Sequence, residues 1–144
     1  MYEALVDLDL FPVSQGGTLT VLVVDDDPKA VELIAVGVTG LASTVLRAYG
    51  GREAIDTARR KLPDLIVLDL MMPEVNGFDV VAALNKDPDT ARIPILVVTS
   101  KQITAEDRAK LTGYVTTIME KAEFEPDRLA AEIRRAMSGR NVVA

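Results

Sequence analysis

Short apolar runs alternate with helix-like segments along most of this chain. The apolar runs predict five strands, over residues 19–24, 44–48, 65–69, 95–98 and 114–119. The segments between and after them predict five helices, over residues 28–39, 52–61, 78–85, 105–111 and 127–137. Alternation of strand and helix is typical of βαβ units, so the pattern predicts an α/β fold with a parallel sheet.

The residue content of the strands predicts their places in the sheet. The first, third and fourth strands are continuously apolar, as strands buried on both faces should be. The second strand contains Arg47, and the fifth contains Thr116 and Thr117. We therefore expect the first, third and fourth strands in the middle and the other two at the edges.

Local signals set the helix ends and the extent of the domain. Asp27 before Pro28 predicts a helix cap, Thr104 with Asp107 predicts a capping box, and Gly139 predicts a helix stop. The Ser-Gln-Gly-Gly stretch at residues 14–17 is typical of a linker. We expect a leader over residues 1–18, one compact domain over residues 19–138 and a short tail over residues 139–144.

Composition narrows the classes of function. The 144 residues carry a net charge of −6, which argues against binding to nucleic acid. The chain has no cysteine and no histidine, which excludes disulfides, thiolate metal sites and a histidine base within it. Acidic rather than basic residues near the start and the absence of a long apolar run predict a cytoplasmic protein with no membrane segment.

Acidic residues follow two of the predicted buried strands. Asp25 and Asp26 come directly after the first strand, and Asp69 ends the third. Ligands bind at the carboxyl ends of strands in open α/β sheets, so these residues predict an acidic pocket. Carboxylates 4 Å apart repel by about 4 kcal/mol per pair, which calls for Mg²⁺ or a fixed lysine. Taken singly, each is also an ordinary turn residue.

Other polar groups follow the remaining strands. Thr99 and Ser100 come after the fourth strand, and Lys121 follows the fifth. The loop after Asp69 begins at Met71 and can present a main-chain carbonyl to a cation. Carboxylates, a hydroxyl and an ammonium group are what a phosphoryl group on an aspartate needs for stabilisation. A glycine-rich nucleotide motif is missing.

At these residues the chain resembles the receiver domain of two-component response regulators, over roughly residues 19–137. The resemblance rests on four stretches, residues 21–28 (VLVVDDDP), 64–77 (DLIVLDLMMPEVNG), 95–100 (ILVVTS) and 120–121 (EK). It implies a flavodoxin-like fold with a five-stranded parallel sheet in the order 2-1-3-4-5. This order agrees with the places expected from the strand compositions.

The resemblance also implies roles for the residues at the strand ends. Its metal ligands for Mg²⁺ are Asp26 directly, Asp25 through water, the phosphoacceptor Asp69 and the main-chain carbonyl of Met71. The resemblance implies two further site residues. The hydroxyl of Thr99 would move toward a phosphoryl oxygen after phosphorylation, and Lys121 would pair with the phosphoryl group.

Two positions depart from the family pattern. Ile118 stands where an aromatic switch residue is common, so we expect packing from it rather than an aromatic rotation. Ala122 stands where proline commonly follows the lysine, so the cis peptide seen in the family is not expected.

The sequence therefore predicts a phosphoacceptor signalling domain rather than a conventional enzyme. Its partners would be a histidine kinase or a histidine phosphotransfer protein. We expect these to dock on the first helix, where Leu33 and Val36 lie off the core-facing stripe, unless that helix is simply buried all round.

Two alternatives remain at this stage. The first is a phosphatase of the haloacid dehalogenase type with Asp25 as nucleophile and Asp27 as acid. Such an enzyme needs an acidic pair after the fourth strand, where this chain has Thr-Ser-Lys-Gln at residues 99–102. The second is an interaction module whose site has lost its chemistry.

Overall fold

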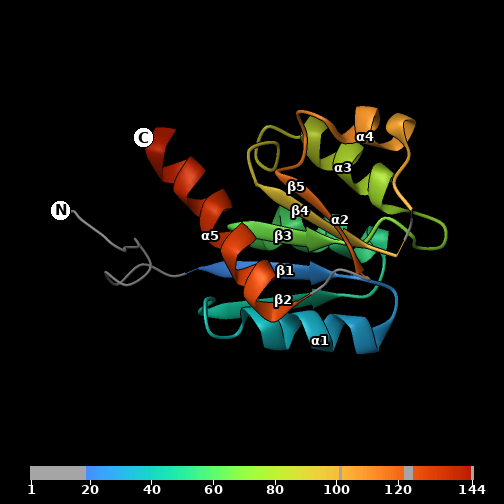
Figure 1. The fold of residues 1–144 in the computed structure, drawn as a ribbon. Coiled ribbons are helices and arrows are strands. Elements are labelled where there is room, and N and C mark those ends of the chain that lie inside the picture. Colours follow the sequence, from blue (N-terminus) through green and yellow to red (C-terminus); the bar gives the residue numbers. More distant parts are fainter. Residues whose placement is uncertain (1–18, 101, 122–124, 144) are drawn as a thin grey trace.

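The fold is a five-stranded sheet with helices on both faces (Figure 1). The computed structural model describes residues 19–100, 102–121 and 125–143. The strands are β1 (Thr20–Val24), β2 (Thr44–Ala48), β3 (Leu65–Leu68), β4 (Ile95–Thr99) and β5 (Thr117–Glu120). The helices are α1 (Pro28–Val38), α2 (Gly51–Lys61), α3 (Gly77–Lys86), α4 (Ala105–Leu111) and α5 (Pro126–Val143). None of the described helices is long and apolar enough to cross a membrane.

The sheet is parallel throughout and has the order β2-β1-β3-β4-β5, as predicted. Every residue of β3 and β4 is buried, and so is every residue of β1 except Thr20. The edge strands β2 and β5 are only partly buried. Because interior strands of a parallel sheet are covered on both faces, continuous apolar runs identify them.

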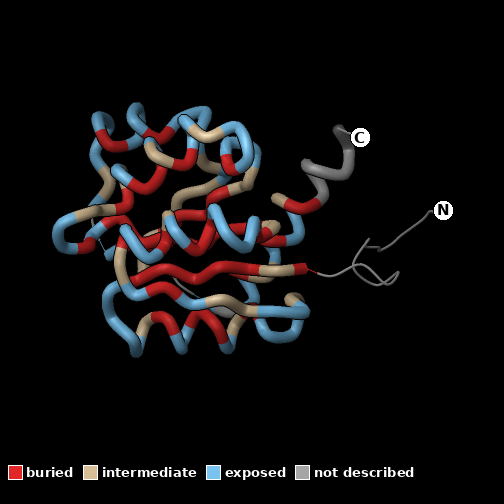
Figure 2. The backbone as a smooth tube through the Cα atoms, turned by 180° about the vertical axis from the view of Figure 1, so that it is seen from behind, coloured by how far each residue is buried: buried red, intermediate tan, exposed pale blue. Residues whose placement is uncertain are grey.

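Two apolar cores lie on opposite faces of the sheet. Alternate strand residues point to opposite sides, so Leu22 packs with α2, α3 and α4, whereas Val21 and Val23 pack with α1 and α5. Figure 2 shows the result, with buried strands in the centre and exposed outer helix turns. Because helices cover both faces of the sheet, polar groups can gather at its two ends.

Helix caps account for most of the boundaries. The Asp27 side chain accepts a hydrogen bond from the Lys29 N–H and caps α1, and Thr104 with Asp107 forms the capping box of α4, both as predicted. A further capping box, Asn76 with Asp79, begins α3. It has the same spacing as the Thr104 and Asp107 box, and it was not predicted from the sequence.

Two predicted boundaries differ from the structure by more than one residue. We expected the fifth strand to begin at residue 114, but the N–H groups of Tyr114 and Val115 both donate to the Leu111 carbonyl and prolong the turn after α4. Helix α5 also continues through Gly139 to Val143, so this glycine does not stop it. A glycine inside a helix costs only about 1 kcal/mol relative to alanine.

Candidate functional site

Three carboxylates meet at the carboxyl end of the sheet. One carboxylate oxygen from each of Asp25, Asp26 and Asp69 lies within 4.8 Å of the others. Asp25 and Asp69 follow Val24 and Leu68, which are paired in the β1–β3 register, so the parallel sheet itself brings their side chains together. Asp25 and Asp69 are buried, whereas Asp26 is exposed. The cluster therefore has a buried floor and one ligand at its rim.

Lys121 partly neutralises this cluster. Its Nζ lies 2.6 Å from Asp25 Oδ2, and its side chain is 28% exposed. The other oxygen of Asp25, Oδ1, accepts a hydrogen bond of 2.9 Å from the Asp27 N–H. Asp25 is thus held by a contact at each oxygen, from the Lys121 ammonium at one and from the Asp27 main-chain N–H at the other.

The surroundings of Asp69 disfavour the charged form of its carboxylate. Burial is the main cause that raises its pKa, and the neighbouring charge of Asp25 raises it further. The charge of Lys121 and hydrogen bonds from the Met71 main chain and the Thr99 side chain lower its pKa, without cancelling the increase. Asp69 Oδ1 is buried and has no hydrogen-bond partner within the described part of the chain.

The pKa of Lys121 is raised by the same cluster. Burial alone would lower it, but the hydrogen bond to Asp25 and the charges of Asp69, Asp25 and Asp27 outweigh burial. The ammonium group is therefore charged throughout the neutral pH range and available as a fixed cation.

Close backbone packing fixes the loop after Asp69. A Cβ atom on Gly77 would lie 2.5 Å from the Asp69 carbonyl oxygen, and one on Gly51 would lie 2.1 Å from the Val75 carbonyl oxygen. Real Cβ atoms do not approach that closely, so both positions need glycine. Sequence reasoning missed Gly51, because its partner is 24 residues away in the chain.

The donor set fits a hard divalent cation such as Mg²⁺. Such ions take oxygen ligands from carboxylates and main-chain carbonyls. The three clustered carboxylates provide such oxygens, and among the residues that the structure describes none donates a hydrogen bond to the buried Oδ1 of Asp69. A bound cation would also relieve the mutual repulsion of the three charges.

Most of the predicted site residues converge at this end of the sheet. Thr99 is buried at the end of β4 and hydrogen-bonds to Asp69, and the Met71 main chain lies beside the same carboxylate. The metal-binding role of the Met71 carbonyl stays a prediction. Ile118 is partly buried and packs against the core that α2, α3 and α4 share. Ala122, like its expected peptide geometry, lies outside the described residues.

Comparison with known proteins gives a consistent answer. Residues 21–134 match the family model of the response regulator receiver domain. The chain is 36% identical over 107 residues to the probable transcriptional regulatory protein TcrX of Mycobacterium tuberculosis, covering 72% of this chain and 45% of TcrX. Protein PilH of Pseudomonas aeruginosa is 35% identical over 81 residues, which are 56% of this chain and 67% of PilH.

A solved structure agrees with these relatives. Chemotaxis protein CheY4 of Vibrio cholerae superimposes with a TM-score of 0.75 at 27% identity, covering 83% of this chain and 98% of that one. The matched segment spans less than half the length of TcrX. The strand order, the acidic cluster and the family match together show that this chain belongs to the response regulator receiver domain family.

Proposed function

We propose that this chain is a phosphoacceptor signalling domain that takes a phosphoryl group from a partner's histidine onto Asp69. The observation that carries the proposal is the environment of Asp69. Its carboxylate is buried among two other carboxylates, a threonine hydroxyl and a lysine, and one of its oxygens has no partner among the described residues. A structural aspartate would be expected to have its oxygens satisfied.

The metal ligands in this proposal are Asp25, Asp26, Asp69 and the carbonyl of Met71. Bound Mg²⁺ would supply positive charge for the oxygens of the incoming phosphoryl group. The Asp25 carboxylate has a fixed orientation in the site, because it contacts both Lys121 and the Asp27 N–H.

In the transfer step, an Asp69 carboxylate oxygen attacks the phosphorus of a phosphohistidine. The new O–P bond forms as the P–N bond breaks, and the electron pair of the broken bond leaves with the imidazole. The Thr99 hydroxyl donates a hydrogen bond to a phosphoryl oxygen. The Lys121 ammonium pairs with another, exchanging part of its contact with Asp25 for this one. These movements change the surface near β4 and β5 and so control partner binding.

A histidine kinase or a histidine phosphotransfer protein is the partner that this chemistry requires, because the chain has no histidine of its own. The expected docking face is α1, where the side chains of Leu33 and Val36 are 58% and 73% exposed. These residues lie off the buried stripe of the helix, so the alternative of a completely buried helix is wrong. We place this exchange in the cytoplasm, with no role for nucleic acid or membrane in this domain.

The proposal is tested by mapping the modified residue after incubation with Mg²⁺ and a small acyl phosphate. We expect a single phosphoryl group on Asp69, and no labelling of Asp69→Asn. A phosphoryl group on Asp25 would contradict the proposal and favour the phosphatase of the haloacid dehalogenase type. No modification at any residue would favour an interaction module without chemistry.

A further inference from the structure

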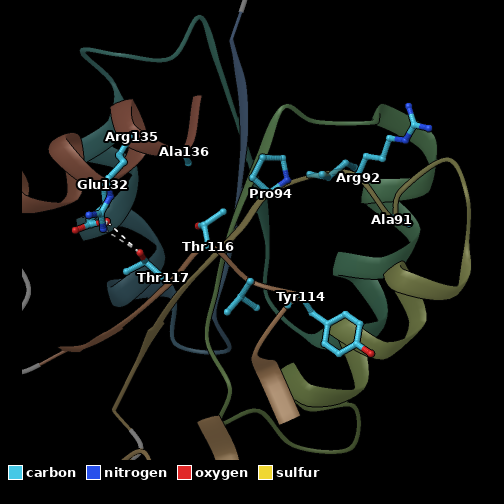
Figure 3. A pocket seen from close by; sticks show the side chains of 12 residues that line it. Ala91, Arg92, Pro94, Tyr114, Thr116, Thr117, Glu132, Arg135 and Ala136 are labelled. Atoms are coloured by element: carbon cyan, nitrogen blue, oxygen red, sulfur yellow. Dashed lines mark hydrogen bonds and ion pairs between the residues drawn. The ribbon is translucent and has the colours of Figure 1, made fainter. Parts of the chain in front are cut away.

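Two hollows meet at Tyr114, which lies just before β5 at the amino end of the sheet. The larger, of about 460 Å³, lies beside the first residues of β4 and β5 and is bordered by α5 (Figure 3). The smaller, of about 320 Å³, lies between α3 and α4. Tyr114 lines both hollows, and its side chain is 49% exposed. We refer to the two hollows together as the Tyr114 surface.

The Tyr114 surface combines apolar and basic side chains. Its smaller hollow is lined by Phe78, Val81 and Leu111 together with Lys86 and Lys110, and its lining contains no acidic residue. The Lys110 ammonium lies 5.4 Å from the centre of the Phe78 ring, so it borders the apolar floor directly.

The larger hollow adds further basic groups. Arg92 lies at its rim, and Arg135 pairs there with the only acidic residue of the lining, Glu132, and with Thr117 (Figure 3). In a chain of net charge −6, this concentration of cations around apolar side chains favours a ligand that is both acidic and apolar.

The first thirteen residues of the chain have that composition. They contain Glu3, Asp7 and Asp9 and no lysine or arginine. Large apolar residues stand between and after these acids, among them Leu5, Val6, Leu8, Leu10 and Phe11. This segment lies outside the described residues, and the proposed phosphoryl chemistry assigns it no role.

The topology puts this segment within reach of the Tyr114 surface. The chain enters the sheet at β1, and all strands are parallel, so β1 begins at the same end of the sheet as β4 and β5. Three interstrand steps separate β1 from β5, a distance of about 14 Å. The five residues 14–18 span up to about 17 Å when extended. Tethering of this kind gives an effective concentration on the order of millimolar, so a weak contact is sufficient.

We propose that residues 1–13 bind in cis to the Tyr114 surface, with apolar side chains in the two hollows and acidic side chains near Lys86, Lys110 and Arg92. An occupied Tyr114 surface is closed to other proteins. The leader is therefore an internal competitor for any partner that binds at this end of the domain. The proposal is independent of phosphorylation at Asp69.

The test uses the full chain, which has no cysteine, so that one introduced cysteine carries one nitroxide spin label. A label at Thr112→Cys, next to the Tyr114 surface, should remove most of the NMR amide intensity of residues 3–11. A label at Lys29→Cys, on α1 at the opposite end of the sheet, should leave it unchanged. Salt at about 1 M, where the screening length is about 3 Å, should weaken the effect.

A charge variant and a mixing experiment complete the test. Lys86→Glu with Lys110→Glu should restore the leader intensity, whereas the matched pair Arg52→Glu with Arg60→Glu, on exposed positions of α2, should not. Equal intensity loss from both label positions, or none from either, would overturn the proposal. So would loss that appears only when isotope-labelled chains are mixed with separate spin-labelled chains, because the contact would then be between two copies.

Discussion

Replacing Asp69 by asparagine removes one of three clustered charges and keeps the shape of the side chain. The oxygens of Asp25 and Asp69 lie no more than 4.8 Å apart, and two unit charges at 4.8 Å in an effective dielectric of 20 repel by about 3.5 kcal/mol. The attraction between Asp69 and Lys121 acts in the opposite direction. We therefore expect Asp69→Asn to raise the free energy of unfolding by about 1–3 kcal/mol at pH 7 without divalent metal.

The pH dependence of this gain follows from the raised pKa of Asp69. In the folded chain Asp69 keeps its proton to a higher pH than its ordinary value of 3.8. The wild-type fold therefore loses stability relative to the variant as the pH rises from about 3.8 through the folded-state pKa, and the full penalty remains above it. The advantage of Asp69→Asn should be large at neutral pH and should disappear toward pH 4.

Urea unfolding followed by far-ultraviolet circular dichroism measures this effect, since the chain has no tryptophan. EDTA keeps divalent metal away, and Asp56→Asn, at an exposed position on α2, is the control, with an expected change within about 0.5 kcal/mol. A destabilised Asp69→Asn variant, or a gain of equal size at pH 4 and pH 7, would show that the carboxylate cluster is not a source of electrostatic strain. Added Mg²⁺ should stabilise the wild type more than the variant.

Three further predictions concern the loop, its support and the docking face. Met71→Asn should accelerate loss of the phosphoryl group, because an amide two residues after the acceptor can orient a water, and an unchanged decay of labelled protein would refute this. Gly51→Ala should lower the free energy of unfolding by about 1–3 kcal/mol and slow labelling of Asp69, because a Cβ there meets the Val75 carbonyl at 2.1 Å. In Gly50→Ala the added Cβ has nothing within 4 Å, so equal effects of the two substitutions would exclude a contact with the loop. Val36→Glu should slow phosphotransfer from a protein histidine donor while labelling by a small acyl phosphate is unchanged, and equal losses with both donors would mean that this position supports the fold instead.

The composition of the strands predicted which of them are central and which lie at the edges, because a strand buried on both faces is apolar throughout; the full order was implied by the resemblance to receiver domains. The uninterrupted apolar runs of β3 and β4 and the arginine in β2 were sufficient to separate centre from edge. The start of β5 was not predictable in the same way. Tyr114 and Val115 have good strand propensity, but their N–H groups satisfy the end of α4.

The candidate site, too, was predictable from the sequence only in part. Parallel strands bring Asp25 and Asp69 together wherever β1 and β3 are neighbours, so their proximity followed from the pattern. The 2.6 Å contact between Lys121 and Asp25 did not, because it depends on how a long side chain packs in three dimensions. The requirement for glycine at position 51 was not predictable either, because it arises only from the packing of the loop containing Val75 against that position.

The interior position of β1 has a consequence for synthesis on the ribosome. Val24 pairs with Ala48 on one side and with Leu68 on the other, so its second partner emerges 44 residues after it. At translation rates of about 5–20 residues per second, that interval is about 2–9 s. During this time β1, with four of its five residues destined for the core, has at least one unpaired edge. The nascent chain therefore passes through a stage in which binding of a chaperone to β1 competes with aggregation, and this stage ends when β3 leaves the exit tunnel.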